Sequence, residues 1–309
     1  MPAYSFFIVR NLPCNTCFPC WPCSSGPATP SSTSSPWGGI QPAEIGFFRW
    51  LLVGLALTPF MLGPVLRNRR YILANLGKFV VLGLLGMAVY QSLAYYAAAL
   101  TSATNMGIIL SLMPLMSLGL ASSILAHRLN AGALLGALVS LAGVVLVISQ
   151  GHLGALLEHG VNLGDAMMIV ATLAYAVYSV LLKKWSLKLP AMQLLYLQVL
   201  VAILALLPLY LLSPRTGLNA ANLPLVLYAA LFASIVAALA WMHGVARLGP
   251  SRMALFFNLL PIITACIATL VLGERLTVHH LVGGALTLAG VLLAEFWQRR
   301  PARLRSATC

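Results

Sequence analysis

Four cysteines near the start of the chain are the first residues whose spacing could support chemistry. Cys14, Cys17, Cys20 and Cys23 recur at every third position and precede a Ser/Pro-rich run. Cysteine at this density is typical of a metal cluster or a disulfide framework. The bacterial ferredoxin pattern needs a longer last interval and a proline after its fourth cysteine, and this segment has neither. We therefore expect no metal site here, and a disordered polar extension remains an alternative.

Arg49 is the second candidate, because it stands inside a long apolar run. A charge in lipid is costly and calls for a partner or a function. Glu44 is the nearest acidic residue in the sequence, and Asp165 is another candidate at a similar depth. Anion binding or gating is one interpretation. An arginine whose head group reaches the outer membrane surface is the other.

The elements that must position these residues are membrane helices. The chain has 309 residues, of which 61% are hydrophobic and 7% charged, whereas soluble domains carry about 25% charged residues. Apolar runs of about 20 residues cross a bilayer as helices that satisfy their own backbone hydrogen bonds. We expect nine such helices, at residues 44–66, 73–97, 102–125, 131–150, 164–184, 190–212, 224–246, 251–272 and 278–297.

The charge distribution predicts how the helices are oriented. The net charge is +13, but the basic residues form short clusters between apolar runs, so we expect a lipid bilayer and no nucleic acid as partner. Alternate gaps between the helices hold 14 Lys and Arg residues in one set and only Arg215 and Arg275 in the other. Basic loops stay in the cytoplasm, so we expect a cytoplasmic C-terminus.

An internal repeat organises the chain. Residues 106–146 align without a gap onto residues 253–293, at an offset of 147. The alignment pairs Pro114 with Pro261 and matches two Leu-Ala-Gly-Val stretches. The second copy contains five helices, and an odd number gives the two copies opposite orientations. The sequence therefore predicts inverted repeats, an architecture common in secondary transporters.

The first copy, with four helices, lacks one near residues 15–37, where the cysteines lie. We hypothesise that this segment is a helix read in a shifted frame. Cys, Ser and Phe codons typically begin with T, and reading one base earlier moves this T to the second position, which encodes only apolar residues. Sequencing the DNA tests this, because an alternative frame must then encode an apolar run.

The order of the motifs resembles a known family. PAEIGFFRWLL (42–52) and YYAAALTSATNMGIILSLMPL (95–115), followed in the second copy by GERL (273–276), resemble EamA-domain transporters of the drug/metabolite transporter superfamily. The first copy departs from GERL, with Ala-His-Arg-Leu at 126–129. The resemblance implies ten helices and transport of small metabolites, amino acids or drugs. It also implies a multi-pass protein of the bacterial inner membrane.

Four segments follow from this interpretation. We expect an anomalous segment at 1–41, a first EamA repeat that lacks its first helix at 42–150, a second repeat at 164–297 and a basic cytoplasmic tail at 298–309.

A transporter of this kind should bind its substrate near the bilayer midplane, between the copies. Pro114 and Pro261 each remove a backbone hydrogen bond and can kink or gate their helices, or bend them only for packing. Polar and aromatic residues within the spans are candidates for the cavity, because such groups normally face the bundle interior. They are Tyr90, Gln91, Tyr95, Asn105, Ser111, Tyr175, Tyr178, Trp241, His243 and Asn258. Trp241 can instead anchor at the interface, and His243 can be structural.

These residues favour secondary transport by alternating access, with export as the expected direction. No H-E-x-x-H or G-x-S-x-G motif indicates an enzyme, and no G-x-x-x-x-G-K-[ST] motif indicates ATP use. We expect no cofactor and a small-molecule substrate. The sequence is compatible with transport coupled to an ion or a proton and with transport without such coupling. It is also compatible with a homodimer. A non-transporting structural or regulatory membrane subunit is the alternative function.

Overall fold

The apolar runs form helices in every part of the chain that the computed structural model describes, namely residues 41–101, 103–126, 131–149, 162–214, 217, 223–263 and 278–299. No strand occurs among these residues. The all-helical prediction is therefore confirmed. The cysteine segment, and the helix hypothesised there in another frame, lie outside the described residues.

Helices occupy all nine expected spans within the described residues. Seven are long and apolar enough to cross a membrane, and the last two spans hold shorter apolar helices, Pro250–Ile263 and Val278–Ala294. The first copy contains α2 (Pro42–Arg67), α3 (Arg69–Ala74), α4 (Leu76–Gly83), η2 (Leu84–Val89), α5 (Tyr90–Leu100), α6 (Ala103–Ser111), α7 (Met113–Ile124) and α8 (Ala131–Ser149). The second contains α10 (Leu163–Trp185), α11 (Ala191–Leu212), α12 (Leu223–Tyr228), η3 (Ala229–Val236), α13 (Ala237–Leu248), α14 (Pro250–Leu255), η4 (Phe256–Leu259) and α16 (Val278–Arg299).

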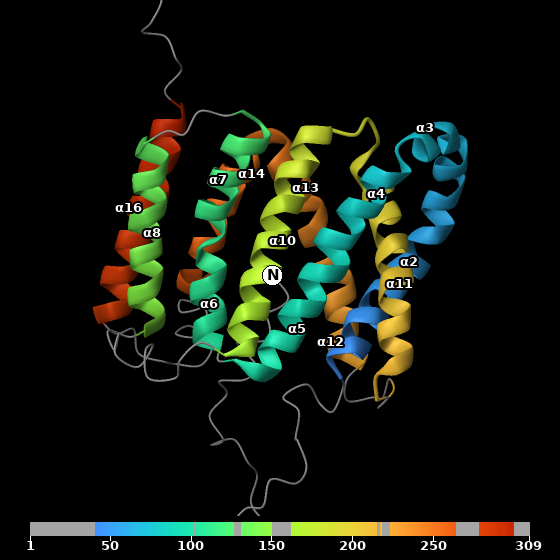
Figure 1. Cartoon of the computed structure of the whole chain (residues 1–309), viewed down its shortest axis with the longest axis horizontal. Helices are drawn as coiled ribbons and strands as arrows, with labels where there is room; N and C mark the ends of the chain where they lie inside the picture. The colour runs from blue at the N-terminus through green and yellow to red at the C-terminus, as the bar shows by residue number, and fades with distance from the viewer. Residues whose placement is uncertain are drawn as a thin grey trace, which may run out of the picture.

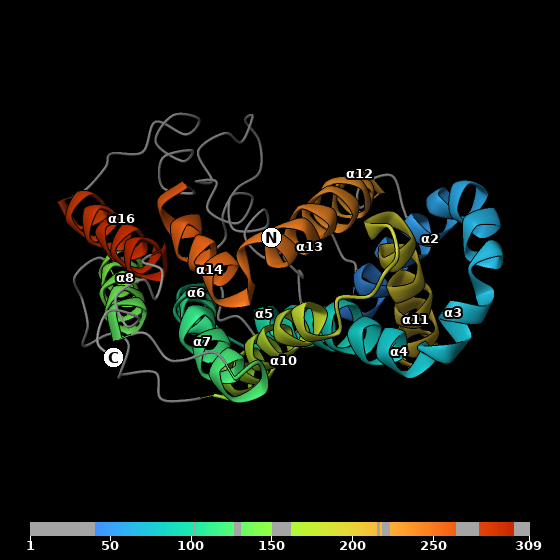
Figure 2. The ribbon, with the colours of Figure 1, turned by 90° about the horizontal axis from the view of Figure 1, so that it is seen from above.

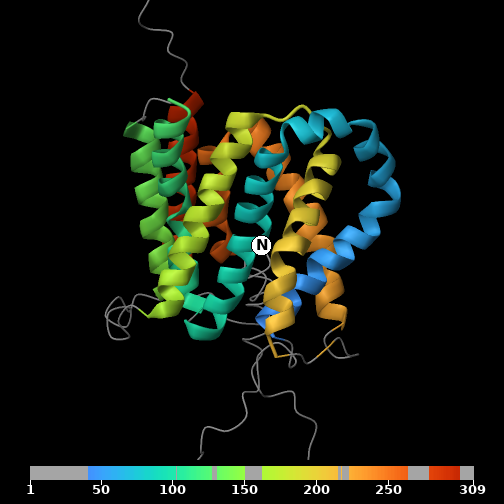
Figure 3. The ribbon, with the colours of Figure 1, turned by 45° about the vertical axis from the view of Figure 1, so that its right-hand side comes forward.

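The helices stand side by side across the molecule, with α8 and α16 at one end and α2 with α11 at the other (Figure 1). Seen from above, they form two rows (Figure 2). One row contains α16, α14, α13 and α12, and the facing row contains α8, α7, α10 and α4. Helix α2 is tilted relative to its upright neighbours (Figure 3). The two rows enclose the middle of the bundle.

Helices α8 and α16 show how the two copies are related. A Cβ atom on Gly136 would lie 2.6 Å from the carbonyl oxygen of Gly290, and a Cβ atom on Gly143 would lie 2.6 Å from that of Gly283. At the offset of 147, Gly136 of the first copy is equivalent to Gly283 of the second, and Gly143 is equivalent to Gly290. Replacing each residue by its equivalent therefore turns the contact of Gly136 with Gly290 into the contact of Gly283 with Gly143. A contact that maps onto itself in this way has a two-fold axis. Because numbers rise along α8 as they fall along α16, the pair is antiparallel and the axis is perpendicular to both helices. The copies are thus inverted.

Two local distortions recur in both copies. The π-helical turn η2 ends at Val89, and η3 ends at Val236, which is the equivalent residue at the offset of 147. The prolines also follow interruptions: α6 ends before Pro114, and the 3₁₀ turn η4 ends before Pro261. A proline ring clashes with the carbonyl four residues earlier, and this clash explains why each helix is irregular one turn before its proline.

Candidate functional site

A cavity of about 90 Å³ lies between α2, the η2–α5 helix, α10, the η3–α13 helix and the α14–η4 segment. It is near the middle of the spans, because Met87 on its wall is at the centre of the Leu76–Leu100 helix and Tyr175 at the centre of α10. One wall consists of aromatic side chains. Alanines at positions 233, 237, 238 and 240 of the η3–α13 helix form another part of the lining, here called the alanine wall, and their small side chains leave the space open.

Arg49 supplies the charge of the cavity. Its side chain is fully buried, so the interpretation that its head group reaches the membrane surface is wrong. Its Nη1 donates to Gln91 Oε1 at 3.1 Å and to Tyr95 Oη at 2.9 Å. Its Nε donates to the Ser234 hydroxyl, and its Nη2 lies 3.5 Å from the carbonyl oxygen of Ala233. All four acceptors are neutral.

The two carboxylates expected near Arg49 have other roles. Glu44 accepts hydrogen bonds from the backbone N–H groups of Gln41 and Gly217. Asp165 caps the first turn of α10, where it accepts from the backbone N–H of Asn162. Among the described residues, no carboxylate hydrogen-bonds to Arg49. Its charge is instead stabilised by the ring of the adjacent Trp50, whose centroid lies 4.7 Å from Cζ.

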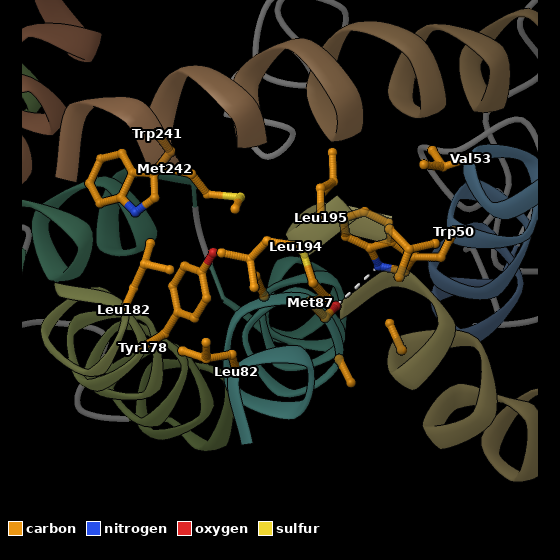
Figure 4. Packing of buried hydrophobic residues seen from close by; sticks show 14 of the residues in the cluster. Trp50, Val53, Leu82, Met87, Tyr178, Leu182, Leu194, Leu195, Trp241 and Met242 are labelled. Atoms are coloured by element: carbon orange, nitrogen blue, oxygen red, sulfur yellow. Dashed lines mark hydrogen bonds between the residues drawn. The ribbon is translucent and has the colours of Figure 1, made fainter. Parts of the chain in front are cut away.

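Each π-helical turn is bonded to one of two neighbouring residues on α2. The Ser234 hydroxyl, which accepts from Arg49, donates to the carbonyl of Ala229 five residues earlier, within η3. Trp50 Nε1 donates to the carbonyl of Met87 in η2 at 3.1 Å, a bond drawn in Figure 4. A π-helical turn shifts backbone hydrogen bonds away from the regular α-helical pattern, so some carbonyl oxygens are open to other donors. The Trp50 and Ser234 side chains donate to two such carbonyls.

The aromatic wall is one continuous stack. Tyr175 stacks on Tyr90 at 4.3 Å between ring centroids and on Tyr178 at 5.4 Å, and lies 5.2 Å from Trp241. Trp241 in turn meets the edge of Phe257 at 4.9 Å. Figure 4 shows Tyr178 and Trp241 on the opposite side of Met87 from Trp50. All of these rings belong to residues that line the cavity.

Several of the polar ends on this wall are already bonded. Tyr178 Oη donates to Gln198 Oε1 at 3.2 Å, and Trp241 Nε1 donates to Ser179 Oγ at 3.2 Å. Trp241 is buried, so it is not the interfacial anchor that its position near a span end also suggested. The other polar groups of the lining include those of Arg49 and Gln91 and the hydroxyls of Tyr90 and Tyr175.

The predicted candidates divide into two groups. Arg49, Tyr90, Gln91, Tyr175, Tyr178 and Trp241 line the cavity. Tyr95 lies behind Arg49 and accepts one of its hydrogen bonds. Asn105, Ser111, His243, Asn258 and the two prolines are not part of the lining.

The polar residues outside the lining bond elsewhere. Asn105 donates to Asp165 at the start of α10, and Ser111 donates to the carbonyl of Ile108 in its own helix. His243 is exposed, and its Nδ1 lies 2.8 Å from the carbonyl oxygen of Leu239. Asn258 is buried and donates to Ser140 Oγ on α8 at 2.9 Å. These bonds hold helices and helix ends in place.

Sequence reasoning missed Ser234, Trp50 and the alanine wall. Trp50 could have been found, because it directly follows the arginine. Ser234 is a single small polar residue in an apolar run, and alanine is common in every membrane helix of this chain, so neither gave a specific signal.

The chain is similar to a described protein family, to curated proteins and to a solved structure. The family described as "EamA-like transporter family" matches residues 34–149 and 162–296. The "Uncharacterized transporter YyaM" of Bacillus subtilis is 26% identical over 264 residues, covering 84% of this chain and 86% of its own. A "Probable terminal-alkyne amino-acid exporter" of Streptantibioticus cattleyicolor is 26% identical, with 88% and 93% covered. A solved structure with 18% identity and a TM-score of 0.65, covering 85% of this chain and 91% of its own, has the same fold.

Proposed function

Because this chain belongs to the EamA-like transporter family, we propose that it is a secondary transporter that moves a small molecule by alternating access through the cavity beside Arg49. The observation that carries the proposal is the position of the cavity. It lies near the middle of the spans, between helices of both copies. Substrate sites of inverted-repeat transporters lie at this depth and interface.

The inverted repeat supports alternating access. Two copies related by an axis in the membrane plane can exchange conformations, and this exchange opens the site to the opposite side. The copies here differ at the corresponding turns, because η3 bonds to Arg49 while η2 bonds to Trp50. Alternating access by exchange of conformations requires that the two copies differ in structure in both the inward-open and the outward-open state.

The clustering of basic residues supports a cytoplasmic position for one end of the bundle. Lys183 at the end of α10 donates to the carbonyl of Ala246 near the end of α13. The backbone N–H of Lys188 donates to Tyr71 Oη at 3.0 Å, beside Arg69 and Arg70. Three basic segments therefore meet at one end of the helices. The last turn of α16 lies at the same end (Figure 1), and the positive-inside rule favours the cytoplasm for this end of the bundle.

Counterflow in reconstituted vesicles tests the proposal. Purified full-length chain in liposomes is offered a defined panel of radiolabelled amino acids and organic acids, with and without a pH gradient to detect proton coupling. We expect saturable flux of at least one probe. The substitution Ala237→Phe should abolish it by filling the cavity, whereas Val236→Phe, at a neighbouring site with 59% exposure, should not.

Export is the expected direction, in keeping with the relative named as an exporter. Cells that carry the gene should therefore release more of the transported probe than cells that lack it. Flux no higher than in protein-free liposomes for every probe, together with unchanged release from cells, would overturn the proposal and favour a non-transporting membrane subunit.

A further inference from the structure

The cavity contains a positive charge that no described carboxylate neutralises. Arg49 is fully buried, and its hydrogen-bond acceptors are a hydroxyl, an amide, a phenol and a backbone carbonyl. An intramembrane charge of this kind is expensive unless something pairs with it. Neutral dipoles and the Trp50 ring reduce this cost, but they leave the net charge in place.

One nitrogen of Arg49 is available for a ligand. A guanidinium has five N–H groups, and Nε together with the two of Nη1 are taken by Ser234, Gln91 and Tyr95. Nη2 has only the 3.5 Å contact with Ala233, which is beyond the usual 2.7–3.2 Å range of a good N–H···O bond. An anionic oxygen in the cavity would form a shorter, charge-assisted bond with this nitrogen.

The rest of the cavity suits a flat, unsaturated body. The rings of Tyr90, Tyr175 and Trp241 and the small side chains of the alanine wall line it. Aromatic rings stack well on flat unsaturated groups. The Tyr178 and Trp241 polar ends are occupied by Gln198 and Ser179, so they offer little to a polar body.

The count of charges limits the ligand further. Arg49 is the one cationic side chain among the described residues that line the cavity, and none of those residues is acidic. A single cation matches a carboxylate better than a phosphate with nearly two negative charges. The ammonium group of an amino acid would find no carboxylate among these residues.

Resting on the proposed transport function, we propose that the substrate is a small carboxylate with a flat, unsaturated body and no second charge, bound with its carboxylate on Arg49. The body contacts the aromatic rings and the alanine wall that line the cavity. This assignment names the substrate class of the cavity from its own charge and shape.

Ligand binding to the purified full-length chain in detergent tests the assignment by calorimetry. The probes are benzoate and cinnamate, their methyl esters, and phenylalanine as a zwitterion of similar size. We expect each acid to bind at least about 30-fold more tightly than its ester, which is the loss that follows when a buried charge pair is broken. An ester that binds as tightly as its acid overturns the proposal, as does a panel in which no acid binds.

The variant Arg49→Gln should weaken binding of the acids by the same factor. Arg67→Gln, on the exposed end of the same helix, is the matched control and should leave binding unchanged. If Arg49→Gln does not fold, the comparison of acid and ester on the unmodified chain decides. Unchanged binding of cinnamate to a folded Arg49→Gln protein overturns the proposal.

The two proposals fail in different ways. Binding of acids without flux in vesicles removes the transport function and leaves the anion site. Flux of phenylalanine in vesicles, with no binding of either acid, retains transport and refutes the carboxylate assignment.

Discussion

Replacing Gly143 with Ala should separate α8 from α16. The added Cβ would lie 2.4 Å from Thr287 Oγ1, 2.5 Å from Thr287 N and 2.6 Å from the carbonyl oxygen of Gly283. Two of these atoms belong to the backbone, so no side-chain rotation removes the clash. Ordinary contacts begin near 3.4 Å, and the helices must therefore move apart by about 1 Å. A gap of this size forfeits a quarter to a half of the dispersion energy of each contact.

We expect Gly143→Ala to lower the free energy of unfolding by about 1–3 kcal/mol, the usual cost of overpacking a well-packed contact. This free energy is measured by reversible unfolding of the purified chain in mixed micelles, to which a denaturing detergent is added in increasing amounts. Gly284→Ala is the matched control on α16, because its nearest neighbour would be Ile262 at 3.8 Å. It should be neutral or stabilising, since Ala exceeds Gly in helix propensity by up to about 1 kcal/mol.

The inverted repeat makes this prediction sharper. Gly290 is the equivalent of Gly143, and a Cβ there would lie 2.3 Å from Ser140 N. Gly290→Ala should therefore cost about as much, and the double variant should cost less than the sum, because one separation of the helices relieves both clashes. A Gly143→Ala protein as stable as Gly284→Ala, or a marked difference between the two equivalent variants, would refute the two-fold contact.

Three further outcomes are expected. Ser234→Ala removes the acceptor of Arg49 Nε and should lower the free energy of unfolding by about 1–3 kcal/mol, measured in the same titration. Trp50→Phe removes the donor to the Met87 carbonyl; it should cost about 1 kcal/mol and raise amide hydrogen exchange in η2. Asp165→Ala removes the capping box of α10; it should cost about 0.5–2 kcal/mol, with faster exchange confined to the first turn of that helix.

The helical spans and the inversion were predictable because they depend on composition and repetition. Runs of about 20 apolar residues dictate helices in lipid. The repeat alignment matched Gly136 with Gly283 and Gly143 with Gly290. A Cβ atom on any of these four glycines would meet backbone atoms of the facing helix at 2.8 Å or less, so these matches of the alignment lie where the backbones of α8 and α16 come together.

The identity of the lining residues was less predictable. In a soluble helix the polar face shows which side is exposed, but a helix surrounded by lipid is apolar on every side and gives no such signal. His243 and Asn258 were therefore indistinguishable from Trp241 by sequence. The partner of Arg49 was also hidden. Glu44 is five positions away, which is about 140° around a helix, and the actual acceptors come from segments 42 to 185 residues distant.

The π-helical turns gave no sequence signal, yet they determine how α2 holds the site. Arg49 and Trp50 are consecutive, so their side chains point about 100° apart, and one bonds to η3 while the other bonds to η2. A ligand on Nη2 competes only with the 3.5 Å contact to Ala233 and leaves the bonds to Ser234, Gln91 and Tyr95 intact. Binding therefore requires little rearrangement of Arg49. Through this single helix, the charge in the cavity is connected to the same distorted turn in both halves of the protein.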